Sequence, residues 1–504
     1  MRNLLPPASL STPVREIRGK VTASIVSTYA AAVLLLPPAP AEADWGALAH
    51  GALVRAVFAQ KKRKAGDFFE LRCGKRAETL LTVAIVAATA SMFERLQAGA
   101  KWARAALATE PRTLLLWQRG ASTEAAQAAT RALLAAVQAA AMPLPSFKSK
   151  PASRVRLVSI DLALGAKLLG LKQELAVAAG TNLVRWLTAL PPNRLDAAGY
   201  RRFLQQLARD LRLQFRFYGE AELKRLGAGA FLAVCQGNAR RDAGIVRLSY
   251  RPRRGSAVPL SLVGKGICFD TGGTNLKPHK SMLDMHTDMS GSAVAVASLH
   301  ALQALNSPLA IDCWLAITEN LIGPTAYKPQ DIVRAHNGTT IQVIHTDAEG
   351  RMVLADTLSI AAARKPRAII DYATLTGACV YALTERYAGA FTNRPERRDM
   401  IEAAGVSSGE RVWCFPMDAD FDTDIESTVA DVMQCASDGK GDHILAARFL
   451  GRFVPPEIPW LHLDLSPATR AGGLAHVATE ITGFGVRYTL DLIQRGWPSG
   501  AARV

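Results

Sequence analysis

The chain contains the stretch VGKGICFDTGGTNLKPHKSMLDMHTDMSG at residues 263–291 and a shorter counterpart, IHTDAEGR, at residues 344–351. Both place lysine and carboxylate side chains on short turns, within otherwise apolar sequence. Buried charges need partners, and several like charges in one place need a metal ion. The pattern therefore predicts a site for two divalent cations, with the ligands Lys265, Asp270, Asp288, Asp347 and Glu349. Lys277 and Arg351 remain free to act on a substrate.

The spacing within the first stretch sets a condition on the backbone. Lys265 and Asp270 are an odd number of residues apart, and a regular strand would place them on opposite faces. Gly266, or a bend after it, must break that alternation if both side chains reach one site. Lys265 can bind a metal ion only as the neutral amine, and we expect burial beside cations to lower its pKa.

These motifs closely resemble those of the leucyl aminopeptidase family of dinuclear metallopeptidases, the M17 type. That family's core reads roughly VGKGxxFDxGGxxLKP, MxxDM and NTDAEGR, and this chain has VGKGICFDTGGTNLKP at 263–278, MHTDM at 285–289 and HTDAEGR at 345–351. Further matches are PPN at 191–193, DYATLTGA at 371–378, HLDLSPA at 462–468 and TGFGVR at 482–487. The resemblance covers roughly 165–504, whereas residues 1–150 match only in general character.

The resemblance implies how the ligands share two ions. Asp270 and Glu349 would bridge both ions, Lys265 and Asp288 would complete one site, and Asp347 would complete the other with its side chain and backbone oxygen. Oxygen ligands with one amine favour Mn, Zn or Mg. Two ions about 3.5–4 Å apart activate water and stabilise a developing oxyanion. The implied activity is the release of N-terminal amino acids, leucine and other apolar residues above all, from peptides with a free N-terminus.

The resemblance also assigns the two remaining cationic side chains. Lys277 would donate to the tetrahedral oxyanion. Arg351 would position a bicarbonate ion, which is the general base in that family. Considered without the resemblance, Arg351 serves equally well as an ion-pair partner of Asp347 or Glu349.

Asp288 opens the helix predicted to begin SGSAVAV, where an acid is also an ordinary cap, and Asp284 is a rival ligand four residues earlier. The match to MxxDM selects Asp288 and leaves Asp284 a supporting role. The chain departs from the family at His345, His286 and Thr271, where Asn, Lys and Ser are usual. No departure removes a proposed ligand, but His345 lies beside the site.

The substrate pocket is predicted by alignment alone. Met285, Thr374 and Gly377 align with positions that line the family's side-chain pocket, and Leu375 would border the same cleft. Core packing is an equal alternative for Met285. The resemblance, and nothing in the periodicity, implies a homohexamer.

The fold class is α/β, because short apolar runs alternate with helical ones. A chain of 504 residues is too long for one ordinary core. We expect a smaller N-terminal α/β domain at 1–165 and a larger catalytic α/β domain at 166–504, with a mixed central sheet flanked by helices. Expected strands of the first domain include VTASIVS (21–27), AAVLLLPP (31–38), LLTVAIVAA (80–88) and TLLLWQ (113–118), with a helix at 121–141. Expected strands of the second include FLAVCQGN (231–238), AVPLSLVGKGICF (257–269), LAIDCWLAI (309–317), TIQVIH (340–345) and RAIIDYATL (367–375).

Two other functions stay open, and the charge of the chain bears on the first. The net charge is +17, and residues 1–150 hold 20 Lys and Arg against 9 Asp and Glu. KKRK at 61–64 is the sharpest cluster; a solvated turn is the simpler interpretation, and a nucleic-acid contact by a DNA-binding regulatory protein is the alternative. A dinuclear phosphoesterase is the third hypothesis, which the LKP and HTDAEGR context disfavours.

The cellular compartment is predicted from cysteines and termini. Seven widely spaced cysteines without a C-x-x-C motif are typical of a reducing cytosol. The N-terminus lacks the uninterrupted apolar region of a signal peptide, and the apolar stretch 29–41 is too short to span a bilayer. We therefore expect a cytoplasmic protein without a membrane partner.

Overall fold

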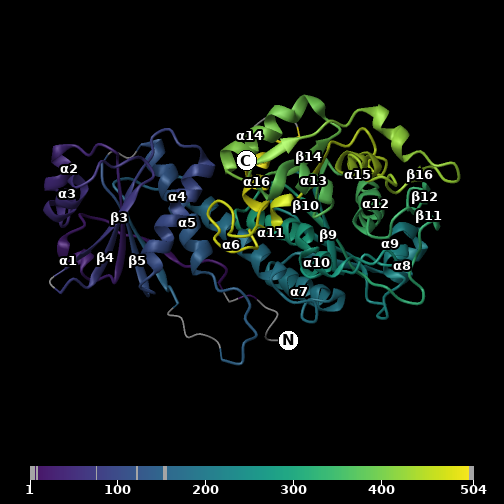
Figure 1. Ribbon diagram of the computed structural model, residues 1–504, viewed down its shortest axis with the longest axis horizontal. Coiled ribbons are helices and arrows are strands. Elements are labelled where there is room, and N and C mark those ends of the chain that lie inside the picture. The colour runs from purple at the N-terminus through teal and green to yellow at the C-terminus, as the bar shows by residue number, and fades with distance from the viewer. Residues whose placement is uncertain (1–5, 7–8, 75, 121–122, 151–155, 499–504) are drawn as a thin grey trace.

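The computed structural model describes residues 6, 9–74, 76–120, 123–150 and 156–498. Two layered α/β units lie side by side, the first around a six-stranded sheet and the second around an eight-stranded one (Figure 1). The expected mixed α/β class is confirmed. Within the described residues no helix combines the length and apolar character needed to cross a membrane. Part of the N-terminal stretch considered for a signal peptide, at residues 1–5 and 7–8, lies outside the described residues.

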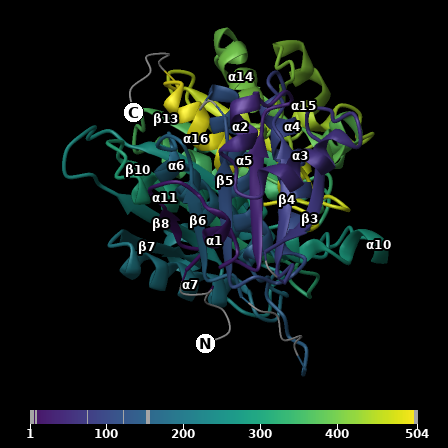
Figure 2. The same cartoon turned by 90° about the vertical axis from the view of Figure 1, so that its left-hand side faces the viewer.

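The first sheet has the order β1-β6-β5-β2-β4-β3, and all its pairs are parallel except β3 with β4. Helices α1 to α3 cover one face, and the longer α4 and α5 cover the other and lie next to the second unit (Figures 1 and 2). The strands are β1 (Val14–Glu16), β2 (Ala31–Leu36), β3 (Phe68–Cys73), β4 (Thr79–Ile85), β5 (Thr113–Gln118) and β6 (Ser159–Ala163). The helices are α1 (Ala23–Val26), α2 (Glu42–Gly46), α3 (Gly51–Ala59), α4 (Met92–Leu107) and α5 (Glu124–Ala141).

The second sheet has the order β15-β14-β17-β13-β9-β10-β8-β7 and mixes parallel with antiparallel pairs. Its strands are β7 (Gln214–Gly219), β8 (Gly244–Tyr250), β9 (Leu260–Asp270), β10 (Ile311–Asn320), β13 (Ala368–Ala373), β14 (Ala388–Thr392), β15 (Val412–Cys414) and β17 (Trp460–Asp464). A small third sheet joins β11 (Ile332–Arg334), β12 (Thr340–Gln342) and β16 (Val432–Met433).

Helices cover both faces of the second sheet, and one lies unusually close to it. The helices are α6 (Leu171–Thr188), α7 (Ala197–Asp210), α8 (Glu220–Arg225), α9 (Gly229–Cys235), α10 (His279–Met282), α11 (Ser290–Ala304), α12 (Glu349–Ala362), α13 (Gly377–Leu383), α14 (Arg398–Ser408), α15 (Asp442–Gly451) and α16 (Val486–Gln494). A Cβ on Gly291 would lie 2.1 Å from the carbonyl oxygen of Tyr372, and one on Gly264 would lie 2.4 Å from Cα of Ser292. These two glycines therefore let α11 pack directly on β9 and β13, which fixes the start of α11 beside the strand ends.

Two apolar runs expected to be strands are helical. Residues 21–27 contain α1, whose N-cap Thr22 accepts a hydrogen bond from the Ile25 amide. Residues 231–238 lie largely in α9, because the buried carboxylate of Asp356 accepts a hydrogen bond from the Phe231 amide at 2.8 Å, in the first turn of that helix. Both expectations were wrong because a short apolar run has no period that separates a strand from a buried helix.

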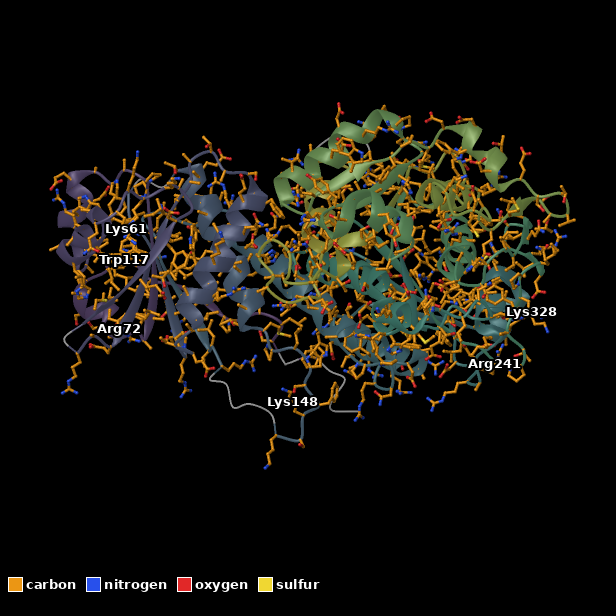
Figure 3. The ribbon with its side chains drawn as sticks, viewed as in Figure 1. Lys61, Arg72, Trp117, Lys148, Arg241 and Lys328 are labelled. Carbon is orange, nitrogen blue, oxygen red and sulfur yellow. The ribbon has the colours of Figure 1, made fainter. Side chains whose placement is uncertain are left out.

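The charged and sulfur-containing side chains differ in exposure. Lys61, Lys62 and Lys64 are exposed, whereas Arg63 packs its guanidinium 4.4 Å from the ring centre of Phe69. Lys61 lies in the first unit, and basic residues such as Arg241 and Lys328 lie in the second (Figure 3). This placement fits a solvated turn, and a nucleic-acid contact stays a prediction.

All seven cysteines are free and buried.

Candidate metal centre

Strand β9 brings Lys265 and Asp270 to the same site by breaking its alternation. Ile267 pairs with Thr318 and Asp270 with Asn320, so β9 uses three residues where β10 uses two. Such a bulge turns later side chains to the other face. The predicted bend is therefore present, and it lies after Gly266. Lys265 and Asp270 are 3% and 2% exposed.

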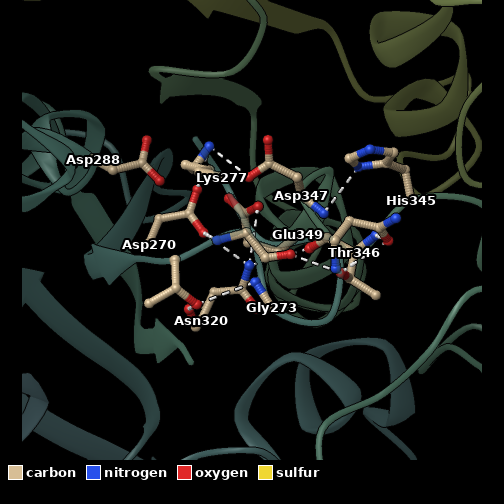
Figure 4. Close-up of polar contacts among 12 residues, drawn as sticks. Asp270, Gly273, Lys277, Asp288, Asn320, His345, Thr346, Asp347 and Glu349 are labelled. Carbon is tan, nitrogen blue, oxygen red and sulfur yellow. Dashed lines mark hydrogen bonds and ion pairs between the residues drawn. The ribbon is translucent and has the colours of Figure 1, made fainter. Parts of the chain in front are cut away.

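Three carboxylates meet at the carboxyl end of this strand (Figure 4). Oxygen atoms of Asp270, Asp347 and Glu349 all lie within 4.8 Å of one another. Asp270 ends β9, Asp347 lies in the loop after β12, and Glu349 is the first residue of α12. The strand expected over 340–345 ends at Gln342, so the second motif is a loop that leads into a helix.

Lys265 lies at the centre of the remaining contacts. Its Nζ is 2.8 Å from Asp288 Oδ2, 2.9 Å from Glu349 Oε1 and 3.0 Å from the backbone oxygen of Thr374. A Cβ on Gly350 would lie 2.7 Å from this Nζ. Gly350 therefore leaves the space that the lysine side chain fills.

Asp288, and not Asp284, joins this cluster. Asp288 is 5% exposed, and its Oδ1 accepts a hydrogen bond of 2.7 Å from the Thr374 hydroxyl. Asp284 is exposed, and its backbone oxygen accepts from Thr287. Asp288 was expected to open the helix, but α11 begins two residues later, after a short 3₁₀ turn at Met285–Thr287.

Lys277 reaches the opposite side of the carboxylates. Its Nζ is 2.9 Å from Asp270 Oδ2 and 2.5 Å from Asp347 Oδ1. Gly272 and Gly273 have φ of +84° and +66°, which only glycine adopts without strain, and they turn the chain sharply between Asp270 and Lys277. The expectation for these two glycines is confirmed.

The cluster holds more negative than positive charge. Burial and then the charge of Asp270 raise the pKa of Glu349 to about 8, and burial likewise raises the pKa values of Asp288 and Asp347. Burial would lower the pKa of Lys265, but Asp288 and Glu349 outweigh it and raise that pKa. The protein side chains by themselves therefore do not lower the pKa of Lys265, and the expected lowering requires bound cations.

The donor atoms suit hard divalent cations. Four carboxylates face two lysines, so with every group ionised two negative charges would be left unbalanced in a buried place. Asp288 Oδ2 and Asp347 Oδ1 are buried and receive no well-directed hydrogen bond, although a lysine nitrogen lies close to each. Cations would use these oxygens and relieve the repulsion.

Comparison with known proteins places this arrangement in a family. The catalytic-domain profile described as that of the cytosol aminopeptidase family matches residues 182–490. The chain belongs to the cytosol aminopeptidase family. The resemblance seen in the motifs is thereby confirmed.

Relatives and solved structures agree with this membership. A probable cytosol aminopeptidase of Syntrophotalea carbinolica is 40% identical over 320 residues, which is 63% of this chain and 64% of the relative, so the match spans just under two thirds of that protein. One from Synechococcus sp. (strain WH7803) is 37% identical over 387 residues, 75% and 77% of the two chains. The bottromycin maturation enzyme BotP in complex with Mn is 30% identical, with a TM-score of 0.79 over 92% of this chain and 98% of that one.

Arg351 of this family member lies apart from the carboxylates to which the sequence could have paired it. Its Nη2 donates to Asp442 Oδ2 at 2.7 Å, and its Nη1 donates to the Gln434 backbone oxygen at 3.2 Å. The alternative ion pair with Asp347 or Glu349 is wrong, because Arg351 pairs with Asp442 at the start of α15.

The four predicted pocket residues form two groups. Thr374 contacts Asp288 and Lys265 directly, whereas Leu375 and Gly377 follow on the loop and first turn after β13. A Cβ on Gly377 would meet nothing within 4 Å, so this side of the loop is open. Met285 is half-buried in the 3₁₀ turn before Asp288.

Several supporting residues were not predicted. Asn320 is fully buried, and its amide donates to Asp270 Oδ1 at 2.8 Å and to the Thr346 backbone oxygen at 3.1 Å. Gln434 accepts from the amides of Ile344 and His345 and donates to the backbone oxygen of Ala348. Asn320 could have been found as a polar residue ending the strand beside β9, but nothing local marks Gln434.

The three departures from the family pattern leave the ligands in place. His345 is exposed and its Nδ1 accepts the Asp347 amide at 3.2 Å. Burial lowers the pKa of the half-buried His286. The Thr271 hydroxyl donates to the Asn320 backbone oxygen at 2.9 Å, as the usual serine could.

Proposed function

We propose that this chain is a metal-dependent aminopeptidase that releases N-terminal amino acids from peptides through two divalent metal ions. One observation carries the proposal. The residues that form the family motifs converge, from three separate segments, on one buried cluster with unbalanced negative charge. Membership of the cytosol aminopeptidase family supports the same activity.

Of the five proposed ligands, two would bind both ions and the other three would bind one ion each. Asp270 and Glu349 lie between the others and would be shared by both ions. Lys265 and Asp288, 2.8 Å apart, would complete one site, and Asp347 would complete the other. The ions, when bound, would activate a water molecule and polarise the peptide carbonyl. Manganese, zinc or magnesium suits these donors, and the manganese in the related BotP complex favours manganese.

Lys277 is the proposed donor to the oxyanion. Its side chain is 12% exposed and is fixed by two carboxylates, so it is largely desolvated before substrate arrives. A preorganised charge in a dry site stabilises developing negative charge without reorganisation. Asp270 and Asp347 would release it in part once cations take up their charge.

The substrate is proposed to be a peptide with a free N-terminus and an apolar first residue. Met285 and Leu375 offer apolar contacts beside the cluster, Thr374 anchors the loop on Asp288, and the open side of Gly377 leaves room. The buried carboxylate of Asp464 fixes this loop by accepting hydrogen bonds from the Leu375 amide and the Thr376 hydroxyl. A leucine preference fits the apolar side chains of Met285 and Leu375.

The remaining assignments also stay proposals. The domain boundary near 165 is supported by β6 ending at Ala163 in the first sheet and α6 beginning at Leu171 beside the second. A hexamer and a cytoplasmic location rest on the family. Light scattering at micromolar concentration tests the hexamer, and a monomer would contradict it.

A metal-dependence assay tests the function. The purified chain is chelated exhaustively, then reloaded with Mn²⁺, Zn²⁺ or Mg²⁺ and assayed on aminoacyl amides, on the same amides with acetylated amines, and on a phosphoester. We expect activity only with metal and only on free amines. Asp347→Ala should lose metal and turnover, while Asp438→Ala, on the exposed loop before α15, should keep both. Full activity in verified metal-free protein would contradict the proposal, and phosphoester hydrolysis would favour the rival enzyme class.

A further inference from the structure

The guanidinium of Arg351 already binds a carboxylate of this chain. Arg351 is two residues after Glu349 on α12, and its side chain is 2% exposed. Its Nη2 binds the carboxylate of Asp442 at 2.7 Å, its Nη1 binds the Gln434 backbone oxygen, and its Nε has no hydrogen-bond partner among the described residues. The Nη2 group of Arg351 is therefore already paired with a carboxylate of the protein.

Asp442 is well placed to be that anion. It is the first residue of α15, after Gly441 with φ of +60°, and an acid in the first turn of a helix is favoured by the helix dipole. Its side chain is 24% exposed, so it is the end of the pair that reaches solvent. Among the described residues, Arg351 binds its Oδ2.

Gln434 ties this pair to the metal ligands. Its backbone oxygen accepts from Arg351, and its side chain binds the backbone of Ile344, His345 and Ala348 around Asp347. The position of Asp442 is therefore fixed relative to the ligand loop through Arg351 and Gln434.

An external bicarbonate does not fit this guanidinium. Asp442 balances the single positive charge of Arg351 through an ion pair of 2.7 Å. A second anion would meet the negative charge of Asp442, which already pairs with Nη2, and that of Glu349, two residues earlier on α12. Placing another anion there would cost free energy, because Asp442 already neutralises the guanidinium.

We infer that Asp442 replaces dissolved bicarbonate as the anion bound to Arg351, so that turnover of this enzyme does not depend on bicarbonate. The inference rests on the proposed aminopeptidase function. Asp442 is a positioning residue, which acts through Arg351. Removing its carboxylate empties the anion site and makes the enzyme bicarbonate-dependent.

The test compares four full-length, metal-loaded proteins in carbonate-free buffer and in millimolar bicarbonate. They are wild type, Asp442→Ala, the isosteric Asp442→Asn and the control Asp438→Ala, whose carboxylate pairs with the exposed Lys440. Wild type and control should be equally active in both buffers. Both Asp442 variants should lose about 10–100-fold in kcat without bicarbonate, as partners of active-site groups typically do, with KM little changed. Bicarbonate should restore most of the loss in Asp442→Ala, which has room for it.

A binding measurement adds a readout that does not depend on activity. In titrations with ¹³C-labelled bicarbonate followed by NMR at equal metal content, Asp442→Ala should bind one more ion per subunit than wild type. Bicarbonate dependence in wild type, full activity of both variants without bicarbonate, or inactive variants that neither bind nor respond to it would each overturn the inference. A wild type inactive on every aminoacyl amide would instead contradict the proposed function.

Discussion

Replacing Lys277 with alanine distinguishes two roles for this lysine, stabilising the oxyanion in catalysis or only balancing the nearby negative charge. The Nζ of Lys277 lies 2.9 and 2.5 Å from two carboxylates, and its neighbours raise its pKa in spite of burial, so the group is charged and fixed. Removing one preorganised oxyanion donor costs about 10²–10³ in kcat, or roughly 2.7–4 kcal/mol of transition-state stabilisation. Because Lys277 carries a full charge in a largely desolvated place, we expect the upper part of that range.

The assay measures kcat and KM on a leucyl amide together with metal content by mass spectrometry. Lys277→Ala should keep both metals and change KM only modestly, because the lysine acts in the transition state more than in substrate binding. Lys280→Ala is the matched control, since Lys280 is exposed three residues further on, in α10. A kcat for Lys277→Ala within about twofold of the control would refute the role, since an oxyanion donor cannot be lost so cheaply.

Three further predictions test other parts of the structure. Asp288→Ala should empty one metal site while Asp284→Ala leaves both filled, and metal analysis giving the reverse would show that the wrong aspartate was chosen. Gly350→Ala should lower metal content with the fold intact, because its Cβ would displace the Lys265 amine; unchanged metal content would contradict this. Burial raises the pKa of Glu410 to about 7, so its folded form prefers the proton, and its contribution to stability falls as pH rises from about 4.5 to 7. Glu410→Gln should therefore raise the thermal midpoint at pH 8, where the buried charge costs on the order of 3 kcal/mol, and change it little at pH 4; equal shifts at both would exclude the mechanism.

Motif spacing predicted that these carboxylates and lysines lie together, but not the backbone that brings them together. The odd interval from Lys265 to Asp270 required a break in the strand, and the break is present, because only a bulge lets both reach one face. The residue at which it occurs depends on pairing with β10, which no local pattern records. Asp288 was distinguished from Asp284 by its motif, since both have the same chemistry.

Partners distant in sequence could not be predicted in this way. Arg351 could be assigned to any nearby acid, and its partner lies 91 residues away at the start of another helix. Gln434 likewise looks like an ordinary loop residue until β16 brings it beside the ligand loop. The helix at 229–235 was mistaken for a strand because the carboxylate that holds its first turn comes from residue 356.

The hydrogen bonds and ion pairs around the carboxylate cluster join residues far apart along the chain. This separation bears on the order in which parts of the protein fold. Lys265 binds the backbone of Thr374, 109 residues later, and the Arg351–Asp442 pair closes another long loop. Closing such loops costs conformational entropy that local contacts do not repay, so the strands and helices must come together first. During synthesis, a chain that has not yet reached residue 442 lacks part of the site. The nascent protein therefore cannot complete the proposed site until residue 442 has emerged from the ribosome.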